Sequence, residues 1–154
     1  MAKTGLRGEA AIVGYAELKP EKKPTGEPAF TIEQWAELAS LALEDAGIDP
    51  GEVDGIVTPA VAESGMFAPA TVAEYLGFEV NFAEHVDLGG ASAAGGIWRA
   101  AAAIELGIAD VVGVAFPAGP LPMPPDPKAH PFPYGASSGE YGSPQAEFDI
   151  PYGN

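Results

Sequence analysis

The chain has 154 residues and carries 7 Lys and Arg against 22 Asp and Glu, which gives a formal net charge of −15. Phosphate binding requires clustered Lys and Arg, so this balance argues against a nucleic-acid partner and an anionic membrane surface. Hydrophobic residues make up 47% of the chain, enough to form a core, and exclude global disorder.

Residue types that are rare or missing narrow the chemistry further. Without cysteine there can be no disulfide, no thiolate metal site and no cysteine nucleophile. The chain has only two histidines, His85 and His130, so we expect no metal site and no resident cofactor. The N-terminus lacks a signal-peptide core, and no apolar run approaches the roughly 18 residues of a membrane span. These features predict a cytoplasmic protein.

Prolines divide the chain into two parts. Ten of the 16 prolines lie in the last 38 residues, so we separate an Ala/Val/Gly-rich body, residues 1–116, from a Pro/aromatic extension, residues 117–154. We expect the extension to wrap over the body or a partner as an irregular arm, the alternative being a polyproline-II ligand for an SH3-like domain. His130 in this extension is a candidate general base, although a lone loop histidine is typical of a surface.

The body opens with an apolar run over residues 10–16, which predicts a strand buried on both faces. A proline-rich loop over residues 17–28 follows. Apolar residues at helical spacing then predict a helix over residues 32–46, which ends where Gly47 supplies the left-handed conformation.

The start of that helix has its own pattern. Thr31 is the expected N-cap, and Gln34 is placed to complete a capping box. Phe30 and Trp35 have the spacing of a hydrophobic staple across the cap.

A single helical turn is expected at Asp49-Pro50, before a second strand over residues 54–58. A second helix is predicted to begin near Pro69 and to end at Gly77. Residues 82–88 predict a third strand, interrupted by charged side chains. His85 near its end has the pattern of a surface residue.

The run over residues 89–106 predicts a third helix, closed by Gly107, and residues 110–116 predict a fourth strand. Strands and helices therefore alternate as βαβαβαβ. This order predicts an α/β fold with right-handed crossovers and a mostly parallel sheet covered on both faces.

The third helix begins with glycines, each of which costs roughly 1 kcal/mol relative to Ala inside a helix. Three interpretations remain: tight packing in a layered fold, a helix N-terminus that binds an anion or thioester oxygen, or both. Its second half is apolar nearly all round, which predicts burial. Arg99 is expected to pair with Glu105 or Asp110, the alternative being a contact with an interface or a ligand.

The order and spacing of these segments resemble the N-terminal half of thiolase-like proteins, specifically the lipid-transfer or sterol-carrier-protein-x branch, which includes steroid side-chain aldolases. The resemblance covers residues 9–115 and rests on four segments: Ala-Ala-Ile-Val-Gly-Tyr-Ala (10–16), Ala-Leu-Glu-Asp-Ala-Gly-Ile-Asp-Pro-Gly-Glu-Val-Asp-Gly-Ile-Val (42–57), Ala-Glu-Tyr-Leu-Gly (73–77) and the Gly/Ala-rich run 89–112. Residues 147–153 resemble the entrance to the loop domain of that branch. The resemblance implies half of an αβαβα layered sandwich with the glycine-rich helix buried inside it.

Thiolases carry their acyl-accepting cysteine at the start of this helix, and the resemblance puts Gly90 at that position. It implies a substrate-binding segment formed by Gly89, Gly90, Ala91 and Ser92. Ser92 is a second candidate nucleophile, but no base lies near it in the sequence, which favours a hydroxyl that bonds the backbone at the helix start.

The resemblance implies a lyase that cleaves a β-hydroxyacyl-CoA by a retro-aldol reaction, because the thiolase nucleophile is replaced. The alternative is a non-catalytic lipid-transfer, acyl-CoA-binding or scaffold homologue. The implied partners are a C-terminal half or second polypeptide that completes the fold, a second copy in a homodimer, and an OB-fold/zinc-ribbon accessory protein.

Overall fold

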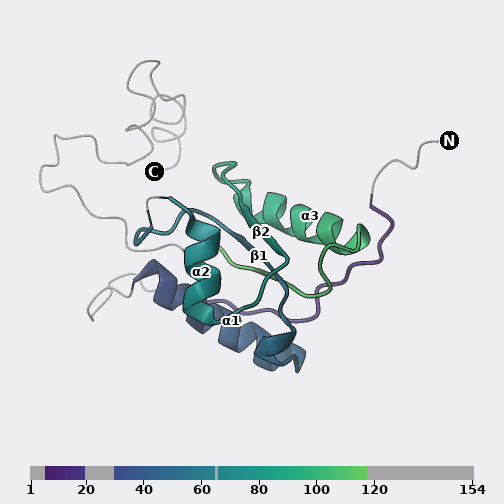
Figure 1. Ribbon diagram of the computed structural model, residues 1–154, viewed down its shortest axis with the longest axis horizontal. Coiled ribbons are helices and arrows are strands. Elements are labelled where there is room, and N and C mark those ends of the chain that lie inside the picture. The colour runs from purple at the N-terminus through teal and green to yellow at the C-terminus, as the bar shows by residue number, and fades with distance from the viewer. Residues whose placement is uncertain (1–5, 20–29, 65, 118–154) are drawn as a thin grey trace, which may run out of the picture. The chain divides into compact units, whose positions relative to one another are not determined.

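The computed structural model describes residues 6–19, 30–64 and 66–117 (Figure 1). The extension from residue 118 onward, with His130, lies outside these residues. The helices and strands of the described part are α1 (Thr31–Ala46), the 3-10 helix η1 (Pro50–Glu52), β1 (Gly55–Thr58), α2 (Ala68–Leu76), β2 (Phe82–His85), α3 (Ser92–Glu105) and β3 (Val112–Val114). No helix among these residues is both long and apolar enough to cross a membrane.

The three strands form one parallel sheet in the order β2-β1-β3, which confirms the α/β prediction. β1 is the middle strand and is paired on both sides, so all four of its residues are buried. β2 and β3 are shorter than the expected strands 82–88 and 110–116, because pairing with the four-residue β1 limits their length.

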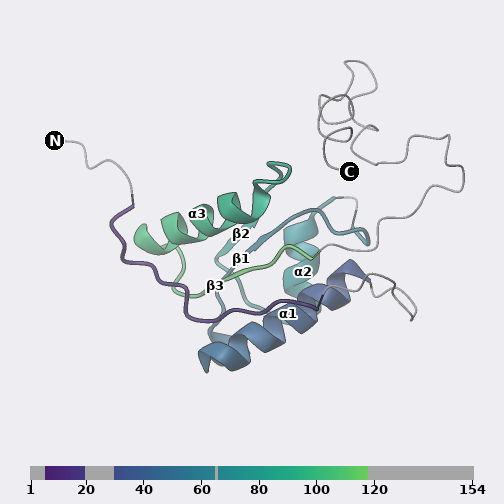
Figure 2. The ribbon, with the colours of Figure 1, turned by 180° about the vertical axis from the view of Figure 1, so that it is seen from behind.

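Successive residues of β1 point to opposite faces of the sheet, as the pleat requires. Ile56 contributes to a core with Trp35 and Val72 beneath α1 and α2, whereas Val57 contributes to a second core with Ala100 of α3. Figures 1 and 2 show α3 on one side of the sheet and α1 and α2 on the other. Coverage of both faces is therefore confirmed.

The start of α1 differs from the expected cap by one residue. The helix begins at Thr31, and Phe30 is the N-cap, whose N–H donates to Glu33 Oε2 at 3.0 Å. The Thr31 N–H instead donates to Glu63 Oε1 at 2.7 Å. Thr31 as N-cap, Gln34 in the capping box and the Phe30 staple were therefore wrong, because a carboxylate from the β1–α2 loop satisfies the Thr31 amide. Phe30 is 62% exposed.

The helix ends were predicted correctly. Gly47 and Gly77 both take the left-handed conformation, with φ of 67° and 70°, and close α1 and α2. The turn at Asp49 is also present as η1, where Asp49 Oδ1 accepts from the Gly51 N–H at 2.8 Å. These ends depend on local backbone geometry, which glycine and Asx residues determine within a few positions.

Residues 10–16 do not form the expected strand. They run without strand pairing, and Ile12 and Val13 are 75% and 62% exposed. A strand needs a neighbouring backbone to bond, and none of the described strands pairs with this segment. Instead the Tyr15 N–H donates to Asp45 Oδ2 at 3.0 Å, and Gly14 packs against the Ala42 carbonyl of α1. Figure 2 shows the segment passing α1 on the side of the molecule where β3 lies.

The chain just before this segment, at residues 7–8, is held by a carboxylate. Glu105 at the end of α3 accepts from the Arg7 N–H at 2.6 and 2.7 Å and from the Gly8 N–H at 2.9 Å. The backbone hydrogen bond from Arg7, the largest cause, lowers the pKa of Glu105 from its usual 4.5, with further contributions from Gly8 and Glu9.

Because the pKa of Glu105 is lowered in the folded chain, its attachment of residues 7–8 is complete above pH 4.5 and is lost as the pH falls through the lower folded value. We expect the Arg7 and Gly8 amide resonances to shift together in that acidic range in an NMR titration. In Glu105→Gln this common transition should disappear. If the Arg7 and Gly8 amides of Glu105→Gln still showed the same acidic transition, the attachment would be contradicted.

Candidate functional site

The carboxyl ends of β1 and β2 form the one place in the described sheet where neighbouring strands send the chain to opposite faces. β1 leads to α2 on one face, and β2 leads to α3 on the other. In open α/β sheets, ligands bind in the crevice that such a divergence creates. The segments at this edge are the loop before α2, the end of β2 and the turn before α3.

The turn before α3 and the first residue of the helix contain the four residues expected to bind substrate. Only Ser92 belongs to the helix, so Gly89, Gly90 and Ala91 precede it and the expected start at residue 89 was wrong. The Ser92 hydroxyl donates to the Gly89 carbonyl at 2.7 Å and accepts from the Leu88 N–H at 2.8 Å. Both bonds tie the turn to the helix, which is the structural role that the sequence favoured.

Gly90 is the position that resembles the thiolase cysteine. A Cβ built there meets no atom within 4 Å, so packing does not require glycine at this point. After it, the exposed Ala93 and Ala94 have N–H groups that donate no backbone hydrogen bond among the described residues. Free N–H groups at a helix start can bond an anion or a developing oxyanion.

The glycines inside α3 have a packing explanation. A Cβ at Gly96 would lie 2.7 Å from the Phe116 ring and 3.2 Å from Val114, and one at Gly95 would lie 2.5 Å from Leu88. The helix therefore approaches the end of β3 more closely than any other residue type would allow. Of the open interpretations, tight packing explains Gly95 and Gly96, while ligand binding stays a prediction for the turn before the helix.

The second half of α3 is not buried all round. Ile97 and Trp98 are 46% and 56% exposed, because the sheet covers only the face of the helix that carries Gly96 and Ala100. Arg99 pairs with Glu84 of β2 at 3.1 Å rather than with Glu105 or Asp110. Its guanidinium carbon also lies 5.6 Å from the Trp98 ring centre. Glu84 alternates with Ala83 along β2 and so lies on the same face of the sheet as Phe82, which packs against the core that contains Ala100 of α3.

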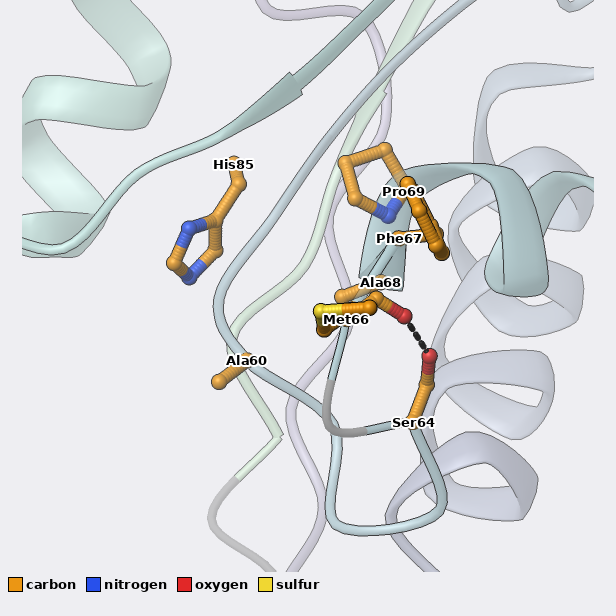
Figure 3. Close-up of a pocket in the computed structure, with 7 residues that line it drawn as sticks. All are labelled: Ala60, Ser64, Met66, Phe67, Ala68, Pro69 and His85. Carbon is orange, nitrogen blue, oxygen red and sulfur yellow. Dashed lines mark hydrogen bonds between the residues drawn. The ribbon is translucent and has the colours of Figure 1, made fainter.

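A cavity of about 120 Å3 lies at the carboxyl edge between β1 and β2 (Figure 3). His85, at the last position of β2, forms one side of it. The other walls come from the loop after β1 and the start of α2, and the complete lining is Ala60, Ser64, Met66, Phe67, Ala68, Pro69 and His85. His85 is exposed, as the sequence pattern predicted, and the fold also brings it opposite a loop some 20 residues earlier.

Phe67 is the one residue other than glycine with a positive φ, 62°, in the described part of the chain. This conformation costs a bulky residue roughly 1–2 kcal/mol, and such strain concentrates at ligand sites. Sequence analysis missed Phe67 and Met66. The sequence signal for them was an apolar pair just before the helix start expected near Pro69; α2 begins at Ala68, and the two side chains are 74% and 70% exposed.

The described residues contain no group of three or more metal-binding side chains that could hold an ion. The Ser64 hydroxyl beside the cavity is already occupied, because it donates to the Met66 carbonyl and accepts from Thr71 Oγ1 at 3.0 Å. The backbone of His85 is paired with β1, whereas its imidazole forms no hydrogen bond with the described residues. The candidate site therefore has two polar features, the His85 imidazole and the N–H groups at the start of α3.

These observations define the structural class of the protein. It is a parallel α/β protein whose candidate site lies at the carboxyl edge of the sheet, beside a helix that begins after a glycine-rich turn.

Two curated proteins are similar to this chain. A steroid side-chain-cleaving aldolase of Thermomonospora curvata is 37% identical over 108 residues, which cover 70% of this chain and 26% of that protein. A 17-hydroxy-3-oxo-4-pregnene-20-carboxyl-CoA lyase of Mycobacterium tuberculosis is 36% identical over 107 residues, with the same coverage of 70% and 26%.

Both relatives are named as enzymes, an aldolase and a lyase. The chain spans about a quarter of their length. No family model matches the chain, and no solved structure matches it significantly.

Proposed function

We propose that this chain is part of a cytoplasmic thiolase-like lyase that cleaves a β-hydroxyacyl-CoA by a retro-aldol reaction. The observation that carries the proposal is the 37% and 36% identity to the two relatives named above. Their names favour a steroid-derived or other lipid-derived acyl chain as substrate. The resemblance to thiolase-like proteins over residues 9–115 supports the same reaction class.

In this reaction a base removes the proton of the β-hydroxyl, and the bond between Cα and Cβ breaks. The hydroxyl-bearing carbon leaves as a ketone or aldehyde, and the electron pair remains on Cα as the enolate of the thioester. A proton added at Cα then completes a shortened acyl-CoA. No covalent nucleophile takes part, which agrees with Gly90 in a chain without cysteine.

The α3 N-terminus supplies what such an enolate needs. Ala93 and Ala94 are exposed residues, and their N–H groups donate no backbone hydrogen bond among the described residues. Donors fixed in place before the reaction stabilise an oxyanion as it develops, and the helix dipole adds to them. We assign these N–H groups, with the turn Gly89–Ala91, to the thioester oxygen.

The acid and base are assigned to polypeptide beyond this chain, either a C-terminal half of the same fold or a second subunit. Two features support such a partner. Trp98 and Ile97 leave an apolar face of α3 exposed, and β3 is paired on one side only among the described strands. A homodimer and an OB-fold/zinc-ribbon accessory protein belong to the same proposal.

The test is turnover by the native assembly, purified through an affinity tag on this chain. With 17-hydroxy-3-oxo-4-pregnene-20-carboxyl-CoA, we expect equal amounts of a steroid ketone and a shortened acyl-CoA, without added free CoA. A requirement for free CoA would indicate thiolysis instead. Tight binding without cleavage across a panel of β-hydroxyacyl-CoA thioesters would favour the non-catalytic alternative and contradict the lyase.

A further inference from the structure

The cavity between β1 and β2 combines apolar walls with one available polar group. Ala60, Met66, Phe67 and Ala68 contribute apolar surface, and His85 faces them from the end of β2 (Figure 3). The Ser64 hydroxyl already donates to the Met66 carbonyl of its own loop and accepts from Thr71 Oγ1 of α2. A ligand here therefore meets the His85 imidazole as its hydrogen-bonding partner.

The size of the cavity limits the ligand. An apolar cavity of about 150 Å3 holds one benzene ring, so a cavity of 120 Å3 that is open to solvent accepts a single ring or a short branched chain. A fused ring system would have to place one end ring inside and leave the others outside.

The protonation of His85 and the negative charge of the chain determine which polar group the ligand can carry. An imidazole carries at least one N–H in either protonation state, whereas it has a free acceptor only when neutral. His85 therefore always has a donor to offer, and the complementary group on the ligand is an acceptor. Asp87 lies two residues away in a chain with a formal charge of −15, which disfavours an anion.

We propose that this cavity is a binding site for a neutral cyclic ketone, with the ring against Met66 and Phe67 and its oxygen accepting from His85. Phe67 supports this because its left-handed backbone holds an aromatic wall at the cavity mouth, where it is 74% exposed. The steroid ketone released in the proposed lyase reaction is also a neutral cyclic ketone, so this part of the inference rests on the proposed function. The cavity itself does not depend on the reaction.

The test uses the full chain with 13C-labelled methionine methyl groups and cyclohexanone as the probe. Met66 lines the cavity, so we expect a saturable shift of its methyl resonance, assigned with Met66→Leu. Cyclohexanecarboxylate has the same ring with a negative charge and should bind at least 10-fold more weakly. Absence of a saturable Met66 shift, or equal affinity for the carboxylate, would overturn the proposal.

Variants test the role of each wall. His85→Leu keeps apolar bulk but removes the donor, and we expect a Kd for cyclohexanone about 5- to 10-fold higher, the usual effect of one lost hydrogen bond. Ala60→Met fills the cavity from an exposed position and should abolish the shift. Tyr75→Ala removes an exposed side chain of α2 outside the cavity and should leave the Kd unchanged.

Unchanged binding in both His85→Leu and Ala60→Met would refute the site. Because this assay measures binding, its result stands apart from turnover by the native assembly. Cleavage without cyclohexanone binding contradicts only the cavity, and cyclohexanone binding without cleavage contradicts only the proposed lyase.

Discussion

Replacing Trp35 by alanine is expected to lower the free energy of unfolding by about 3–5 kcal/mol, the range for a large aromatic removed from a core. Trp35 is 1% exposed and packs with Ile56 and Val72 between α1 and the sheet. Its Nε1–H donates to Thr58 Oγ1 at 3.0 Å, so the same side chain also ties α1 to the end of β1. Urea unfolding followed by far-UV circular dichroism measures the loss.

Trp98 provides a matched control for this substitution. It is the other tryptophan of the chain and is 56% exposed on α3. Trp98→Ala should cost at most about 1 kcal/mol, because little apolar area leaves a buried environment. Trp35→Phe keeps an aromatic ring but loses the bond to Thr58, so an intermediate loss is expected. Equal losses for Trp35→Ala and Trp98→Ala would contradict the assigned core.

Gly96→Val is expected to destabilise the chain by about 1–3 kcal/mol, the usual cost of overpacking. The new Cβ would lie 2.7 and 2.9 Å from two atoms of the Phe116 ring and 3.2 Å from Val114. Both neighbours belong to β3 and its continuation, so α3 or β3 must shift. Higher helix propensity offsets part of the cost, since valine replaces glycine within a helix. Thermal and urea unfolding give the difference.

Gly90→Val is the control from the same glycine-rich segment. A Cβ at Gly90 meets nothing within 4 Å, and its φ lies outside the left-handed region, so a change within about 0.5 kcal/mol is expected. If Gly90→Val destabilised as much as Gly96→Val, the glycines would act through backbone freedom rather than through packing on β3.

Local signals predicted the helices and most strands. Gly47 and Gly77 fixed two helix ends because the left-handed conformation at a helix end favours glycine wherever the helix lies. The apolar run of β1 was read correctly because a strand buried on both faces needs no alternation. Residues 10–16 have the same kind of pattern, yet they form no strand, since composition does not tell whether a partner strand is present.

The candidate site was predicted only in part. The sequence predicted that the Ser92 hydroxyl bonds the backbone at the start of α3, because a serine just before an apolar helical run commonly does so. The structure shows these bonds to Leu88 and Gly89. His85 and Phe67 had no shared signal, because they lie on separate elements 18 positions apart. The parallel pairing of β1 and β2 places the end of one beside the loop that follows the other, and this creates the cavity.

The sequence by itself determined the α/β alternation, the ends of α1 and α2, and the loss of cysteine chemistry from the helix start, because these depend on residue identity and on contacts within a few positions. The tertiary structure decided which face of α3 is covered, why Gly96 is needed, and which side chains meet His85. These depend on strand order and on how closely a helix approaches the sheet, and both arise from packing between segments far apart in the chain.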